Sequence, residues 1–146
     1  MITAVDSNVL LDVLGADPTF GAASREALRR CVAEGELIAC DVVWAEMVGA
    51  LPSEAVATEA MRRLGLRFSP LEARAAGSAG ESWRAYRRAS GERVRLVADF
   101  LIGPHAQDQA DRLLTRDRGF YRSYFKDLEI VEPAIERRST SVGPSS

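Results

Sequence analysis

Lysine and histidine are nearly absent from this sequence. The 19 basic residues comprise 18 arginines and a single lysine, Lys126, and His105 is the only histidine. A mechanism that needs a catalytic lysine therefore has one candidate, and a zinc site built from histidine and cysteine has too few ligands. Arginine binds phosphate groups well, but genomic base composition explains the excess of arginine at least as well.

Disulfide, secretion and membrane signals are also missing. The two cysteines, Cys31 and Cys40, form no CxxC motif, which favours a reducing compartment. The first residues lack the basic-then-apolar pattern of a signal peptide, and no apolar run is long enough to span a membrane. The net charge of −2 gives no overall attraction to nucleic acid. We expect a cytoplasmic protein without a membrane partner, in which any RNA-binding surface is local.

The length of the chain is typical of one domain. A chain of 146 residues of which 47% are hydrophobic is long enough to bury its own core. The last residues carry no apolar face. We therefore expect a folded domain over residues 1–135 and a disordered tail over residues 136–146.

Short apolar strands alternate with helices, and there are no internal repeats. This alternation predicts a three-layer α/β/α domain whose parallel sheet of four to five strands is covered by helices on both faces. The expected strands are residues 2–5, 36–40, 66–68, 112–115 and 128–131. In such a sheet the functional crevice lies beyond the carboxyl ends of the strands, where the winding direction reverses.

Local signals mark the ends of several helices. Gly15 and Gly35 are expected to end the first two helices, and Ser53 is expected to begin a later one. The sequence Ser-Pro-Leu-Glu at residues 69–72 predicts a capping box that opens a long helix. Pro104 lies inside an expected helix and predicts either a bend or an early end there.

Four acidic residues are predicted to meet at one edge of the sheet. Asp6 follows the first strand, Glu46 lies one turn into the apolar helix after the second strand, and Asp117 follows the fourth. Asp99 lies within the apolar stretch VADFLIG and so needs a polar partner. Three of them have an alternative role: Asp6 and Asp117 can cap helices, and Asp99 can be an acid in a first helical turn, where the helix dipole favours it. An unpaired Glu46 on a buried helix would be costly.

Electrostatic repulsion makes such a cluster informative. Two like charges about 4 Å apart at a partly buried site repel by about 4 kcal/mol, so four carboxylates require protons or a counter-ion. Carboxylates with water suit Mg²⁺ or Mn²⁺, which promote phosphodiester cleavage. The residues alone thus favour a metal-dependent nuclease. Three further acids, Asp12, Asp108 and Asp111, are expected to be solvated, with Asp111 kept as a distant ligand candidate.

Four stretches together resemble a known family. VDSNVLLD, the glutamate in VVWAEMVGAL, RLVADFLIGPHA and LLTRDRGFY resemble, in order and spacing, the PIN-domain ribonucleases, specifically the VapC-type toxins of toxin–antitoxin pairs. The resemblance implies that Asp6, Glu46, Asp99 and Asp117 bind Mg²⁺ or Mn²⁺, and that the hydroxyl of Thr115 positions water or ligand. It also implies cleavage of single-stranded RNA or of structured tRNA or rRNA loops, a homodimer, and a VapB-type antitoxin whose tail covers the site.

Several side chains remain open to two interpretations. The RNA-binding candidates near the acids are Arg93, Arg95, Arg116, Arg118 and Arg122. Trp83 and Tyr86 are expected in the core rather than on a stacking surface, and His105 in a structural or hydrogen-bonding role.

Two other functions remain as alternatives. An aspartate-nucleophile phosphatase or phosphoacceptor domain also places an aspartate after the first strand, but it would want an acid at position 8 and a late lysine at a strand end. Here position 8 is Asn8, and Lys126 is the sole lysine. The other alternative is a catalytically idle PIN-like binding module, against which the intact acidic set argues.

Overall fold

The fold is built on one parallel sheet. The computed structural model describes residues 1–90 and 97–134, so Arg93, Arg95 and the predicted tail at 136–146 lie outside the described residues. The sheet has five strands in the order β3-β2-β1-β4-β5, and each neighbouring pair is parallel. The strands are β1 (Ile2–Val5), β2 (Glu36–Ala39), β3 (Leu66–Phe68), β4 (Arg112–Leu114) and β5 (Ile130–Val131). The predicted parallel α/β architecture is confirmed.

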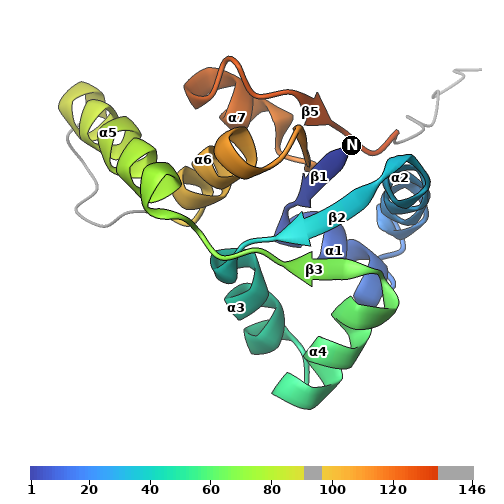
Figure 1. The fold of residues 1–146 in the computed structure, drawn as a ribbon. Helices are drawn as coiled ribbons and strands as arrows, with labels where there is room; N and C mark the ends of the chain where they lie inside the picture. Colours follow the sequence, from blue (N-terminus) through green and yellow to red (C-terminus); the bar gives the residue numbers. More distant parts are fainter. Residues whose placement is uncertain (91–96, 135–146) are drawn as a thin grey trace, which may run out of the picture.

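Helices cover both faces of this sheet. They are α1 (Ser7–Leu14), α2 (Gly21–Glu34), α3 (Asp41–Ala50), α4 (Glu54–Arg63), α5 (Ala73–Ser90), α6 (Asp99–Gln109) and α7 (Arg118–Tyr124). Figure 1 shows α1 to α4 on one side of the sheet and α5 to α7 on the other. This division follows from right-handed crossovers, because the chain moves outward through β2 and β3 and then returns across the sheet to β4.

The winding direction reverses between β1 and β4. These two strands are neighbours in the sheet although about 100 residues separate them, and the amide of Asp6 donates to the carbonyl of Leu114 (2.9 Å). The residues that follow both strands therefore emerge side by side at the carboxyl edge. This is the position at which open α/β sheets usually bind ligands.

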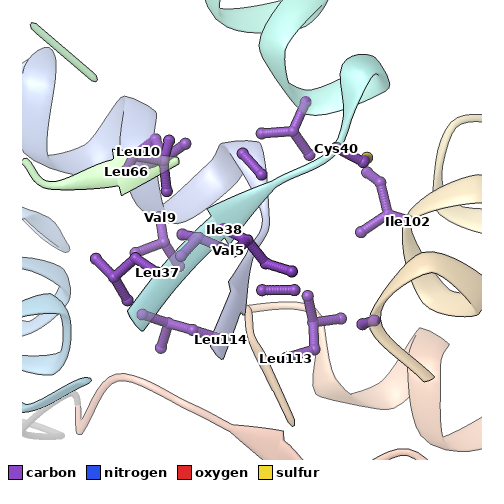
Figure 2. Packing of buried hydrophobic residues seen from close by; sticks show 14 of the residues in the cluster. Val5, Val9, Leu10, Leu37, Ile38, Cys40, Leu66, Ile102, Leu113 and Leu114 are labelled. Carbon is purple, nitrogen blue, oxygen red and sulfur yellow. The ribbon is translucent and has the colours of Figure 1, made fainter. Parts of the chain in front are cut away.

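The core lies on both faces of the central strands. Val5, Ile38 and Leu113 are at most 1% exposed. Figure 2 shows Val9 and Leu10 of α1 on one side of these strands and Ile102 of α6 on the other. Trp83 is buried, and Tyr86 is partly buried and packs against the core, as predicted. Since these side chains fix the strands from both faces, the strand ends are held in rigid positions.

Local signals predicted some helix ends and failed at others. Gly15 and Gly35 follow the last residues of α1 and α2, and the Ser53 hydroxyl accepts from the amide of Val56 (3.1 Å). The predicted capping box is wrong, because α5 begins at Ala73. The hydroxyl of Ser69 instead contacts Nε2 of His105 (3.1 Å) and accepts from Gln109 (3.2 Å). The Ser69 hydroxyl therefore makes tertiary contacts with α6 instead of capping α5. His105 has the hydrogen-bonding role that was expected of it.

Pro104 does not end its helix. The residue lies inside α6, which continues to Gln109. Pro104 and its neighbours Gly103 and His105 are buried, so packing offsets the missing backbone hydrogen bond. Among the described residues, no helix combines the length and the apolar character needed to cross a membrane.

Candidate active site

Asp6 lies at the centre of the candidate site. It follows β1 directly and is only 3% exposed. Its Oδ2 accepts hydrogen bonds from the hydroxyls of Thr115 (2.9 Å) and Tyr121 (3.0 Å). Burial raises the pKa of Asp6, these hydrogen bonds lower it in part, and the charge of Asp117 raises it further. The fold thus holds a carboxyl group where its charged form is disfavoured.

Asp99 is the second acid of the site. It is the first residue of α6 and is half-buried, and its Oδ1 accepts from the hydroxyl of Tyr121 (3.2 Å). Burial raises the pKa of Asp99, and the nearby charge of Asp6 raises it further. One tyrosine hydroxyl therefore joins two acids that are 93 residues apart in the sequence. The predicted convergence of Asp6 and Asp99 is thereby seen in the structure.

Glu46 and Asp117 lie at the rim of this pair. Glu46 is exposed on α3, so the expectation that it is buried is wrong. Desolvation nevertheless raises the pKa of Glu46, the charges of Asp6 and Asp99 raise it further, and a hydrogen bond with Ser7 lowers it in part. Glu46 therefore lies within electrostatic range of both acids. Asp117 is exposed and precedes α7 as its N-cap, but its side chain makes no capping hydrogen bond.

A polar network joins the ends of β1 and β4 around the acids. The buried Thr115 accepts from the amide of Asp117 (3.0 Å) and donates to Asp6. The side-chain amide of Asn8 lies 3.3 Å from the hydroxyl of Thr115, and its Oδ1 accepts from the amide of Arg116 (3.2 Å). This network fixes the hydroxyl of Thr115 against Asp6.

The donor chemistry of the site fits a small, hard cation. Within residues 1–90 and 97–134, no three His, Cys, Asp or Glu side chains form a group that could hold a metal ion. Two carboxylates do meet at one hydroxyl, and Mg²⁺ is usually bound by one or two carboxylates with several waters retained. Zinc prefers cysteine and histidine, whereas the side chains that hydrogen-bond to these carboxylates are those of Ser7, Asn8, Thr115 and Tyr121 in the described part of the chain.

Arg116 has a partner inside the protein. Its guanidinium binds both carboxylate oxygens of Asp12 (2.6 and 3.0 Å) and lies 4.0 Å from the ring centre of Phe20. Asp12 is buried and also accepts from the hydroxyl of Ser24 (2.7 Å). The expectation that Asp12 is solvated is therefore wrong. Arg116, an RNA-binding candidate, stands in a structural ion pair.

The other candidates are dispersed. Arg118 and Arg122 are exposed on α7, and Arg118 pairs loosely with Glu132 (3.7 Å). Asp111 precedes β4, and its Oδ2 accepts from the amide of Ile2 (2.6 Å) at the amino ends of the strands. Asp111 is therefore at the edge of the sheet opposite the acids, and its proposal as a distant ligand is wrong.

Sequence reasoning missed Tyr121. The residue was quoted only as part of a motif, yet its hydroxyl is the group that contacts both Asp6 and Asp99. The available signal was its place one helical turn after Asp117, on the same short helix. Asn8 was weighed only as a missing acid, whereas its amide forms part of the network around Thr115.

Comparison with known families identifies the domain. A sequence model of the PIN domain matches residues 3–126. The chain belongs to the PIN domain family. Comparison with curated protein sequences gave no match.

Solved structures share this PIN fold. VapBC2 from Rickettsia felis, bound to a promoter DNA fragment, matches with a TM-score of 0.68 and 17% identity over 90% of this chain and 98% of that one. DNA-bound VapBC from Salmonella typhimurium matches with a TM-score of 0.67 and 16% identity, over 92% of this chain and 99% of that one. VapC20 of Mycobacterium tuberculosis is described as a sarcin–ricin loop cleaving toxin. It matches with a TM-score of 0.55 and 15% identity, over 83% of this chain and 94% of that one. At these identities the likeness shows the fold.

Proposed function

We propose that this PIN-domain protein is a metal-dependent endoribonuclease and the toxin of a type II toxin–antitoxin pair. The observation that carries the proposal is the pair of acids, Asp6 and Asp99, held on one hydroxyl at the carboxyl edge of the sheet. Burial raises the pKa of both acids, the charge of Asp117 raises that of Asp6 further, and the charge of Asp6 raises that of Asp99, so a cation at this place is favoured. The solved toxin–antitoxin complexes that share the fold support the same assignment.

Mg²⁺ or Mn²⁺ is the proposed cofactor, with Asp6 and Asp99 as ligands. A bound ion of this kind activates water and stabilises the leaving oxygen of a phosphodiester. Thr115 holds Oδ2 of Asp6 in place through a short hydrogen bond. Glu46 and Asp117, exposed at the rim, are proposed to complete the ligand set or to orient water.

The proposed substrate is single-stranded RNA or a structured loop of tRNA or rRNA. VapC20, which has the same fold, is described as cleaving the sarcin–ricin loop. Arg118 and Arg122 are exposed on the helix that carries Tyr121 and can contact phosphate groups. Arg93 and Arg95 remain predictions outside the described residues. Arg116 is set aside, because its guanidinium is occupied by Asp12.

The proposed protein partner is a VapB-type antitoxin. Two adjoining grooves run between α1, α2 and α4, of about 590 and 420 Å³, and they share Arg63 and Leu64. Apolar side chains line them, and Val56 and Val32 are about half exposed there. Because Arg25 and Arg29 border the second groove, an antitoxin segment with apolar and acidic side chains suits this surface. A homodimer is proposed from the resemblance alone, and a cytoplasmic location from the cysteine usage and the first residues of the sequence.

Cleavage of RNA with and without metal tests the proposal. Purified protein should cut RNA with Mg²⁺ or Mn²⁺ and stop with EDTA. Asp6→Asn and Asp99→Asn should each lower the rate by about 100-fold or more, because each removes a proposed ligand. Asp108→Asn is the matched control: this acid is on the same helix as Asp99 and pairs with Arg74 (3.1 Å).

Three outcomes distinguish the alternatives. Full cleavage by both ligand variants would refute the metal-binding roles. A folded wild-type protein that binds RNA without cutting it in either metal would identify an idle binding module. Hydrolysis of a phosphomonoester that depends on Asp6, without RNA cleavage, would identify the phosphatase.

A further inference from the structure

Tyr121 is the group that brings the two central acids together. Its side chain is fully buried, and its hydroxyl lies 3.0 Å from Oδ2 of Asp6 and 3.2 Å from Oδ1 of Asp99. These acids come from β1 and α6, on parts of the chain that meet only through the tertiary fold. A hydroxyl group between them therefore defines their separation.

The ring of Tyr121 is held firmly enough to set that separation. Phe120 and Phe125 pack against it, with ring centres 5.2 and 6.1 Å away. A tyrosine hydroxyl is neutral at neutral pH and can therefore act as a hydrogen-bond donor. The position of the hydroxyl is thus fixed by packing that is independent of the acids.

The two acids depend on Tyr121 to different degrees. Asp6 also accepts from Thr115 and follows a strand whose position the sheet fixes. For Asp99, Tyr121 is the one hydrogen-bond partner of the side chain within the described residues. A phenol has a single proton, so it donates to one carboxylate at a time, and its oxygen can accept from the other acid when that acid is protonated. Loss of the hydroxyl would release the Asp99 side chain first.

We propose that Tyr121 is a positioning residue that aligns Asp6 and Asp99 so that both carboxylates bind the same divalent cation. The inference rests on the proposed metal-dependent function and adds to it a residue outside the acidic set. Groups that hydrogen-bond to metal ligands fix ligand orientation, and their removal typically weakens metal binding by about 10–100-fold.

Tyr121→Phe tests the proposal, because it removes one oxygen and keeps the ring. Mn²⁺ binding to the full chain is measured by isothermal titration calorimetry, beside the melting temperature of the metal-free protein. We expect the variant to bind Mn²⁺ about 10–100-fold more weakly. Tyr124→Phe is the matched control, since Tyr124 lies on the same helix, is 44% exposed and makes no contact with the acids. Unchanged or tighter binding by folded Tyr121→Phe would overturn the proposal.

A second measurement uses the wild-type chain and so does not depend on whether the variant folds. With tyrosine labelled at the ring carbon that bears the hydroxyl, the NMR signal of Tyr121 should shift as Mg²⁺ is added. Its midpoint should match that of calorimetric Mg²⁺ binding, while the signal of Tyr124 should stay in place. A Tyr121 signal that does not respond to saturating Mg²⁺ would overturn the positioning role.

The two proposals fail in different ways. If the wild-type protein binds neither Mn²⁺ nor Mg²⁺, the metal-dependent function fails, and the role of Tyr121 fails with it. If the wild-type protein binds the ion and cuts RNA while Tyr121→Phe binds equally well, only the positioning role fails.

Discussion

At the scale of single residues, Asp6 and Asp99 are the acids of the site whose charged forms the fold disfavours. Both carboxyl groups have pKa values raised above their ordinary value of 3.8, chiefly through burial. A carboxyl group with a higher pKa in the folded protein than in the unfolded chain binds its proton more tightly when folded. Its contribution to the free energy of unfolding is therefore lost as the pH rises through the folded value.

This argument predicts the pH dependence of the metal-free protein. In EDTA, the free energy of unfolding of the wild-type protein should fall, relative to that of Asp6→Asn, as the pH rises above the ordinary carboxyl pKa of 3.8. The variant carries no ionisable group at this position, so it escapes the penalty of charging a buried carboxyl. Urea unfolding of both proteins at a series of pH values measures the difference. The free energy of unfolding of Asp6→Asn minus that of the wild-type protein should grow as the pH rises. If it stays constant or decreases, the raised pKa of Asp6 is contradicted.

The ion pair between Arg116 and Asp12 predicts a large loss of stability in a single variant. Arg116→Ala leaves the buried Asp12 charge without its cation and should lower the free energy of unfolding by about 3 kcal/mol. The double variant Asp12→Asn/Arg116→Ala removes both charges and should lose less. Urea unfolding at neutral pH compares the two. A single variant no less stable than the double variant would show that the pair is not coupled.

Residue-level prediction worked where position in the sheet decided the outcome. Asp6 and Thr115 follow neighbouring parallel strands, so their meeting could be anticipated from strand order alone. The contacts of Asp12 with Arg116 and of Tyr121 with Asp6 could not be placed, because they depend on how whole helices pack and not on strand pairing. Helical periodicity predicts on which face of a helix a residue lies, but it does not predict which residue of another element that face contacts.

At the scale of elements, α6 packs tightly around Gly103. A Cβ atom at this position would lie 2.6 Å from Cε2 of Phe125, whose ring is itself buried. Gly103→Ala should therefore lower the free energy of unfolding by about 1–3 kcal/mol, despite the better helix propensity of alanine. Gly80→Ala is the matched control, because a Cβ there would meet no atom within 4 Å.

The control should behave in the opposite way. In Gly80→Ala the helix propensity acts alone and should stabilise α5 by about 0.5–1 kcal/mol. Thermal or urea unfolding of both variants gives the comparison. If both substitutions change the free energy of unfolding equally, the Phe125 ring must move aside to accommodate the added methyl group.

Elements with strong local signals were predictable, and those governed by tertiary contacts were not. Gly15, Gly35 and Ser53 mark helix ends as expected, since the signal for each lies within one turn. Ser69 carried an equally clear capping signal, but its hydroxyl is used by His105 on another helix. Local sequence specifies what a residue can do, and packing decides which option is used.

At the scale of the whole molecule, strand order determines which acids meet. The reversal between β1 and β4 places Asp6 and Thr115 at the carboxyl edge, and Asp111 at the opposite edge. The return of the chain across the sheet then brings α6 with Asp99, and α7 with Tyr121, over the same edge. Alternation of strands and helices predicted that Asp6 and Asp99 would meet, whereas the place of Asp111, the role of Tyr121 and the exposure of Glu46 depended on details of packing.

Crystallography of the protein with Mn²⁺ tests the central claim most directly. At saturating Mn²⁺, the anomalous difference map should show one strong peak in contact with the carboxylates of Asp6 and Asp99, and the peak should be absent from Asp6→Asn crystals. A map without a peak at these two side chains, or with the ion bound elsewhere, would contradict the account.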